Sequence, residues 1–220
     1  MLFSVVIPAF NAADTIEETI RSVLAQSVQP EEIVLVDDGS TDGTSDVARR
    51  LGEIVRIIRQ DNAGVGRATT VGLAAVRSSL VATLDADDLW LPHKMAVQIE
   101  HLRNQPECHG AFSLWRTFLS GQEAGGVGQG WSRTTMLMRT DAALRVGPVI
   151  DPPGGRGDMI DWIARAREIG LRLDMLDEVL TLRRIRPGSL SYGRDPSRDR
   201  GYAEVAWLAL QRRKQRSSAE

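Results

Sequence analysis

Three aspartates stand within four positions at the end of an apolar run. The segment TLDADDLW (83–90) contains Asp85, Asp87 and Asp88. A turn that follows a strand favours one aspartate, because the side chain bonds nearby backbone N–H groups. Three such charges repel one another, by about 1–4 kcal/mol per pair at about 4 Å and surface-like dielectrics. A hard divalent cation, Mg²⁺ or Mn²⁺, binds one or two protein carboxylates and takes its other ligands from water and phosphate. The spacing therefore predicts a metal–phosphate site.

Other kinds of site are excluded by their patterns. A calcium loop that began at Asp38 would need a glutamate at its twelfth position, where the chain has Arg49. GVGRAT lacks the third glycine of a dinucleotide fingerprint, and no glycine precedes a lysine as in a P-loop. The three histidines lack zinc-site spacing, and the single cysteine, Cys108, excludes an internal disulfide and a cysteine-rich metal site.

The elements that must position these acids alternate along the first hundred residues. Short β-branched runs predict strands, and apolar residues at helical spacing predict helices between them. This alternation predicts βαβ units and a mostly parallel, Rossmann-like sheet flanked by helices. Ligand sites of such sheets lie at the carboxyl ends of the strands. PAFN (8–11), DDGSTDG (37–43) and DADD (85–88) should therefore meet at one edge. The predicted strands are 2–8, 32–38, 54–59 and 80–84, and the predicted helices are 14–26, 44–51 and 65–77.

The second half of the chain is less regular. We expect a glycine-rich loop at 121–130, either a mobile lid or a surface loop without a role, because five of its ten residues are glycine. Trp115 and Trp131 could form a stacking platform for a ligand, although core packing suits Trp115 better. The predicted helices are 92–104, 158–170 and a tail after 193, and the predicted strands are 110–116, 134–139 and 177–185.

Four segments together resemble the nucleotide-binding half of family-2 glycosyltransferases, which have the GT-A fold. They are SVVIPAFNAADTIEETIRSVLAQS, EEIVLVDDGSTDGT, DNAGVGRATTVGLAAV and VATLDADDLWLPHKM. The resemblance covers residues 3–95 almost continuously, with the motifs in the order and spacing of the family. It implies a GT-A type α/β fold and a nucleotide-sugar donor.

The resemblance also implies roles for residues of the first two motifs. Pro8, Ala9 and Phe10 would line the pocket of the nucleotide base, with the ring of Phe10 against the base. Asp38 would accept a hydrogen bond from the ring N–H of the base. The alternative for Phe10 is a core aromatic residue.

The third and fourth motifs imply further roles. Arg67 would contact the phosphate or base region of the donor, unless it is a solvated helix arginine. Asp85 would hold the ribose, and Asp87 would bind the metal ion that bridges the diphosphate. Asp88 would support its neighbours or cap the next segment.

Attack on the sugar from the side opposite the metal needs a general base. GDMIDW (157–162) resembles the family's EDxDW helix start, but it has one acid where a pair is usual. Asp158 is the first candidate for the base and Asp161 the second; the alternatives are a helix cap for Asp158 and an ion pair with Arg165 for Asp161. Arg186 stands near the family's histidine. We expect Arg186 or Arg184 to clamp the diphosphate, the alternative being a solvated strand edge.

The sequence thus predicts a single GT-A domain over 1–220, with a nucleotide-sugar-binding half (1–104), an acceptor and catalytic half (105–193) and a helical tail (194–220). It would be an inverting, Mn²⁺- or Mg²⁺-dependent hexosyltransferase, with UDP-sugar favoured and a glycan, lipid-linked, peptide or small acceptor. The formal charge of −2 excludes a broad nucleic-acid-binding face.

The single cysteine suits a reducing cytoplasm. The absence of a leader and of a long apolar run predicts no transmembrane segment, and the protein could form an oligomer. The main alternative is a catalytically weak nucleotide-sugar-binding module. A nucleotidyltransferase ranks lower, because the first strand lacks a glycine-rich signature.

Overall fold

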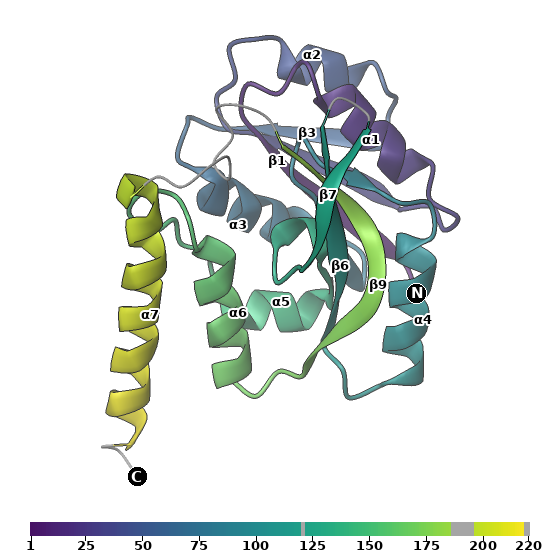
Figure 1. Cartoon of the computed structure of the whole chain (residues 1–220). Helices are drawn as coiled ribbons and strands as arrows, with labels where there is room; N and C mark the ends of the chain where they lie inside the picture. Colours follow the sequence, from purple (N-terminus) through teal and green to yellow (C-terminus); the bar gives the residue numbers. More distant parts are fainter. Residues whose placement is uncertain (120–121, 186–195, 218–220) are drawn as a thin grey trace.

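The fold is built on a nine-stranded mixed sheet, seen in a computed structural model that describes residues 1–119, 122–185 and 196–217. Strands run in the order β3-β2-β1-β4-β8-β6-β9-β5, and β7 pairs with β6 (Figure 1). The strands are β1 (Phe3–Ala9), β2 (Glu32–Asp37), β3 (Val55–Arg59), β4 (Leu80–Thr83), β5 (Leu89–Trp90), β6 (Gly110–Leu119), β7 (Gln122–Gln129), β8 (Leu137–Arg139) and β9 (Leu173–Arg184). The helices are α1 (Ile16–Leu24), α2 (Thr44–Arg49), α3 (Val65–Ala75), α4 (Lys94–Asn104), α5 (Thr140–Val146), α6 (Asp158–Glu168) and α7 (Pro196–Ser217), with a 3₁₀ turn, η1 (Arg133–Thr135).

The first four strands are parallel and are covered on both faces, as the alternating pattern predicts. Alternate side chains of β1 point to opposite faces. Val5 and Ile7 belong to one core with Ile16 of α1, and Val6 belongs to a second core with helix α3. A Cβ on Gly72 would lie 2.2 Å from Val6 Cγ1, so α3 packs against β1 at a distance that only glycine permits. This packing fixes the strand ends that carry the polar segments.

The remaining strands extend this sheet with mixed directions. Strand β8 is antiparallel to β4 and β6, and β9 is parallel to β6. Helix α5 and strand β5 were not predicted. Apart from residues 120–121, the expected glycine-rich loop is largely a strand, β7, so the loop prediction was wrong. Gly128 shows why this strand contains glycine. It pairs with Trp115 of β6, and a Cβ on Gly128 would lie 2.3 Å from the Trp115 ring, so only glycine leaves room for the indole.

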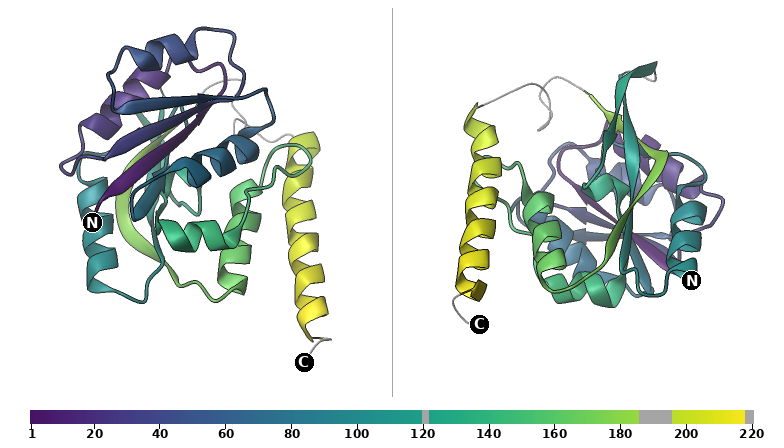
Figure 2. Two further views of the ribbon diagram at one scale, coloured as in Figure 1. Left: turned by 180° about the vertical axis from the view of Figure 1, so that it is seen from behind. Right: turned by 60° about the horizontal axis from the view of Figure 1, so that its bottom comes forward.

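Helix α7 lies along α6 at one side of the molecule (Figures 1 and 2). Its Arg212 bonds Asp161 Oδ1 (2.9 Å) and Glu168 Oε2 (2.8 Å) on α6. Near its start, Gly201 approaches Arg156 so closely that a Cβ would lie 2.0 Å from the carbonyl oxygen. The tail is therefore docked on the helix that begins at Asp158. Within the described residues, no helix is both long and apolar enough to cross a bilayer.

Lys94, at the start of α4, is buried, and no carboxylate of the described chain forms an ion pair with it. Its Nζ donates to Gln98 Oε1 at 2.6 Å and lies 4.2 Å from the centre of the Trp90 ring. Burial lowers the pKa of this lysine well below its ordinary value. In the unfolded chain the pKa is about 10.4.

This lysine predicts a pH-dependent stability. Between the folded and unfolded pKa values the unfolded chain binds the extra proton, so stability rises with pH in that window, by at most about 1.4 kcal/mol per pH unit. We expect Lys94→Met to remove this part of the rise. Urea unfolding from pH 7 to 10 would measure it, and identical pH slopes for the two proteins would contradict it.

Candidate active site

The three polar segments meet at the carboxyl ends of β1, β2 and β4, as predicted. They border a cavity of about 920 Å³, within the range typical of small-molecule sites. The opposite wall comes from the second half of the chain: η1, the loop before α6 and the first turns of α6 and α7. The lining residues that the sequence had singled out are Pro8, Ala9, Phe10, Asp38, Asp85, Asp87 and Asp158.

One end of the cavity is formed by the segment after β1 and by Asp38. Ala9 is buried, whereas Phe10 is 51% exposed and faces the cavity, so it is not a core aromatic residue. The Asp38 carboxylate is buried and accepts hydrogen bonds from Gln60 Nε2 (2.7 Å) and from the backbone N–H groups of Ala63 and Gly64 (2.9 Å each). These bonds join the end of β2 to the start of α3. They hold the carboxylate in place at the cavity wall.

The DADD carboxylates have different surroundings. Asp85 accepts a hydrogen bond from Arg133 Nη1 at 2.8 Å, and Asp87 faces the cavity. Asp88 is buried, and burial together with the charges of Asp87 and Asp85 raises its pKa well above the ordinary value. The Thr134 hydroxyl lies 2.7 Å from Asp88 Oδ2 and 3.1 Å from Asp85 Oδ2. Asp88 is thus a buried structural acid.

Arg133 is the centre of the charged network. Its side chain is 7% exposed, and its guanidinium bonds Asp85, Asp158 and the Thr69 hydroxyl. Burial alone would lower the pKa of Arg133, but the carboxylates of Asp158 and Asp85 outweigh burial and raise it. The arginine therefore links the acid after β4 to the acid at the start of α6. It was not among the predicted site residues, because SRTT carries no recognisable spacing.

The two candidate bases occupy different places. Asp158 begins α6, lines the cavity and bonds Arg133. Asp161 is buried away from the cavity lining and is bonded by Arg165 Nε (2.8 Å) and Arg212 Nη1 (2.9 Å). The i,i+4 ion pair considered for Asp161 is therefore present. Geometry favours Asp158 as the residue that meets a substrate.

A second acid in the cavity wall, Asp151, was also not predicted. Its carboxylate accepts hydrogen bonds from the Gly66 N–H (2.8 and 3.0 Å), at the start of α3. Burial, with a smaller contribution from the charge of Asp158, raises the pKa of Asp151. A lone acid in the Pro- and Gly-rich segment before α6 is the signal that could have found it. The Arg67 side chain is exposed and outside the cavity lining, and its N–H lies 3.4 Å from Asp151 Oδ2.

The arginines at the end of β9 differ from the expected clamp. Arg184 bonds the Asp87 carbonyl oxygen through Nε (2.7 Å) and Glu18 through Nη2 (2.6 Å), while the neighbouring Arg183 lines the cavity. Arg186 lies outside the described residues. The Trp115 ring, half-buried, has the Arg183 guanidinium 5.2 Å from its centre. Trp131, also half-buried, packs on Phe112 with ring centres 4.9 Å apart.

The carboxylate oxygens at this edge of the sheet suit a divalent cation that takes most of its ligands from water and phosphate. Asp87 offers an oxygen ligand of the kind Mg²⁺ and Mn²⁺ prefer, beside Asp85 and Asp88. Within the described chain, the DADD carboxylates do not converge as a three-ligand group; such a group occurs elsewhere. Water and phosphate oxygens would have to complete the coordination here.

The chain resembles known proteins in sequence and in fold. The family model described as Glycosyl transferase family 2 matches residues 4–116. A glycosyltransferase of Nostoc sp. is 45% identical over 104 residues, which is 46% of this chain and 32% of that protein. The chain thus spans about a third of the length of this relative.

Two solved structures have the same fold. The Staphylococcus aureus protein TarS (residues 1–349), in complex with UDP-GlcNAc, has a TM-score of 0.76 at 21% identity, over 95% of this chain and 65% of that one. The mannosyltransferase PcManGT of Pyrobaculum calidifontis, in complex with GDP-Man and Mn²⁺, has a TM-score of 0.68 at 20% identity, over 86% and 58% of the two chains. The predicted GT-A type fold is confirmed.

Proposed function

This chain belongs to glycosyl transferase family 2, and we propose that it transfers a sugar from a nucleotide-diphosphate donor to an acceptor hydroxyl with inversion at the anomeric carbon. The observation that carries the proposal is the cavity where the donor-motif residues and Asp158 face each other. UDP-sugar is the favoured donor, which the UDP-GlcNAc complex of TarS supports.

Residues of the first half would bind the donor. Pro8, Ala9 and Phe10 would contact the base, since the exposed ring of Phe10 offers a flat face for stacking. Asp38, whose orientation is fixed by three hydrogen bonds, would accept the bond from the ring N–H of the base. Asp85 would hold the ribose with the oxygen not bonded to Arg133.

The leaving nucleoside diphosphate carries the charge that develops during transfer. A divalent cation held by Asp87 would neutralise that charge. The Mn²⁺ in the PcManGT complex supports this assignment. Arg183 lines the same cavity and could contact phosphate through its guanidinium, in the role expected of Arg184 or Arg186.

Asp158 would take the proton from the acceptor hydroxyl. It enters the cavity from α6, on the second half of the chain, and the donor motifs form the facing wall. While Arg133 bonds this carboxylate, one oxygen is occupied and the other stays available for an acceptor. A single base without a second nucleophile is what an inverting displacement needs.

The Asp87 assignment gives a direct test of this function. We expect Asp87→Asn to weaken donor binding in the presence of Mn²⁺ by at least about tenfold, or about 1.4 kcal/mol, because the cation loses its charged ligand. Calorimetry with UDP-, GDP- and dTDP-sugars, with and without Mn²⁺, would identify the donor and measure the loss. Asp141→Asn, the same change on the exposed start of α5, is the matched control.

Two outcomes would count against the proposal. Unchanged Mn²⁺-dependent binding in Asp87→Asn would show that the metal lies elsewhere. Tight donor binding without release of nucleoside diphosphate, even with excess Mn²⁺ and varied acceptors, would favour the alternative function, a nucleotide-sugar-binding module.

A further inference from the structure

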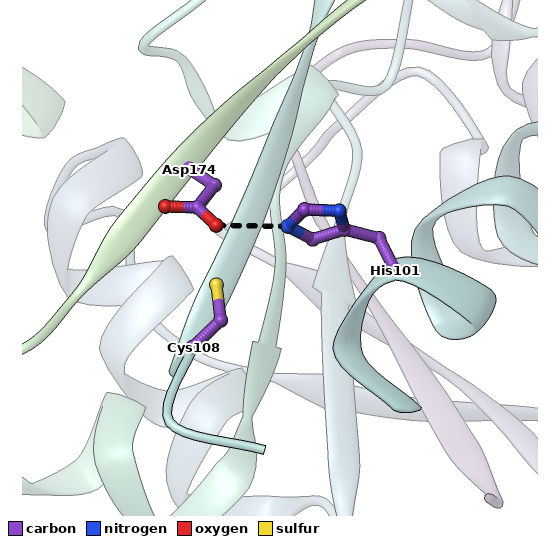
Figure 3. A group of neighbouring side chains, drawn as sticks. All are labelled: His101, Cys108 and Asp174. Atoms are coloured by element: carbon purple, nitrogen blue, oxygen red, sulfur yellow. Dashed lines mark hydrogen bonds and ion pairs between the residues drawn. The ribbon is translucent and has the colours of Figure 1, made fainter. Parts of the chain in front are cut away.

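A second group of ligand-type side chains lies outside the cavity (Figure 3). It consists of His101 in the last turn of α4, Cys108 in the turn before β6, and Asp174 at the start of β9. The ligand atoms of these three residues all lie within 4.8 Å of one another. His101 Nε2 and Asp174 Oδ2 are 2.9 Å apart, and Figure 3 shows the Cys108 sulfur directed toward this pair.

The combination of sulfur, imidazole nitrogen and carboxylate oxygen selects among metals. Mg²⁺ and Ca²⁺ prefer oxygen ligands alone, whereas Zn²⁺ binds Cys, His and Asp in tetrahedral sites. In such a site the ligand atoms stand about 2.0–2.3 Å from the ion. Ligand atoms that already lie this close to one another can reach a common ion by small side-chain rotations. We propose that His101, Cys108 and Asp174 form a zinc site with one coordination position open to solvent.

The neighbours of the cluster support the ligand geometry. Arg172 bonds both oxygens of Asp174, Oδ1 through Nε (3.2 Å) and Oδ2 through Nη2 (3.2 Å), and so holds the carboxylate beside His101. Carboxylates that bind a metal are typically held in turn by hydrogen bonds from neighbouring groups, and Arg172 is such a group. Arg172 also bonds Glu107 at 2.5 Å, so its charge is shared with a second acid. His101 and Asp174 are about one-quarter exposed, which gives an ion access from solvent.

Cys108 would change most on binding. Its thiol now donates to the Gly110 carbonyl oxygen at 3.2 Å, and burial raises its pKa to about 11. Zinc binds the thiolate, so the thiol proton would be released to solvent as the Zn–S bond forms.

This site is separate from the proposed donor site. Strands β4 and β6 are both antiparallel to β8, so they run in the same direction. Cys108 precedes β6 and Asp174 begins β9, whereas the donor segments follow the ends of β1, β2 and β4. The cluster thus lies at the opposite edge of the sheet. A zinc ion there would tie α4 to the starts of β6 and β9 and would not depend on the proposed transfer reaction.

Cobalt titration of the full chain tests the proposal. Co²⁺ replaces Zn²⁺ in such sites, and a thiolate ligand gives a sulfur-to-cobalt charge-transfer band that an all-oxygen site lacks. Because Cys108 is the single cysteine, the band would show that Cys108 is the thiolate ligand. We expect one equivalent of Co²⁺ to produce the band, Zn²⁺ to abolish it, and Cys108→Ser to lose it.

Two further variants make the test sharper. His101→Gln and Asp174→Asn should each weaken Co²⁺ binding at least tenfold, whereas Asp87→Asn at the donor site should leave the band unchanged. His101 lies on the surface of a helix, so its variant is expected to fold; thermal unfolding without metal checks this. A wild-type protein without the band, or an equally strong band in both His101→Gln and Asp174→Asn, would overturn the proposal.

Discussion

Replacing Asp158 with asparagine is expected to lower kcat for nucleoside-diphosphate release by about 10²–10⁴-fold, the usual contribution of a general base. Asparagine keeps the size of the side chain but cannot accept a proton. Donor affinity should change much less, because most residues proposed to bind the donor come from the first half of the chain, across the cavity from Asp158. Steady-state kinetics at saturating donor, with calorimetry for the donor Kd, would separate the two effects.

Asp161→Asn is the matched control, because it makes the same change three residues further along α6. Asp161 is outside the cavity lining and is bonded by Arg165 and Arg212. Its replacement should lower the free energy of unfolding by about 1.5–3 kcal/mol, as expected for charged hydrogen bonds, and leave kcat nearly unchanged. If the large kcat effect appears in Asp161→Asn and not in Asp158→Asn, the second candidate is the base.

Arg133→Met is expected to cost about 3–5 kcal/mol of folding free energy at pH 7. The methionine would fill much of the space but would leave Asp85 and Asp158 without their shared cation, in a site where Arg133 is only 7% exposed. Loss of one partner of a buried ion pair leaves an uncompensated charge, which is the costly case. Urea denaturation would measure the loss.

Two further variants serve as controls in this experiment. One tests charge against shape at position 133, and the other removes an exposed ion pair. Arg133→Lys keeps the positive charge but not the fork of donors, so it should recover part of the stability and less of the activity. Arg21→Met removes an exposed i,i+4 pair with Glu17 and should change stability by less than about 1 kcal/mol. An Arg133→Met protein as stable as Arg21→Met would contradict the role of Arg133 as the counter-ion.

The parallel half of the fold and its polar edge were predictable because local patterns determine them. A β-branched run such as SVVIPA encodes a buried strand, and the polar residues after it must lie at the carboxyl edge. The sequence predicts that a divalent cation offsets the repulsion within DADD, and the structure adds a positive charge that was not predicted. This charge is the guanidinium of Arg133, which is 48 positions from Asp85 in the chain. No local pattern identifies a residue that acts through a tertiary contact.

The second half shows where composition misleads. Five glycines within 121–130 indicate a loop, yet most of the segment pairs with β6 as β7. Here glycine accommodates a neighbouring aromatic ring, and a single sequence does not reveal which side chain will lie opposite. Asp151 was not predicted for a similar reason. The Gly66 N–H that donates a hydrogen bond to its carboxylate is 85 positions away in the chain.

The docking of α7 on α6 matters for anyone who chooses where an expression clone should stop. A clone that ends at Gln211 would retain every described residue of the cavity wall, including Tyr202. It would nevertheless discard Arg212, which neutralises Asp161 and Glu168 on the reverse side of α6. Such a shortened chain is expected to unfold more easily around α6, although the residues that line its cavity are all present.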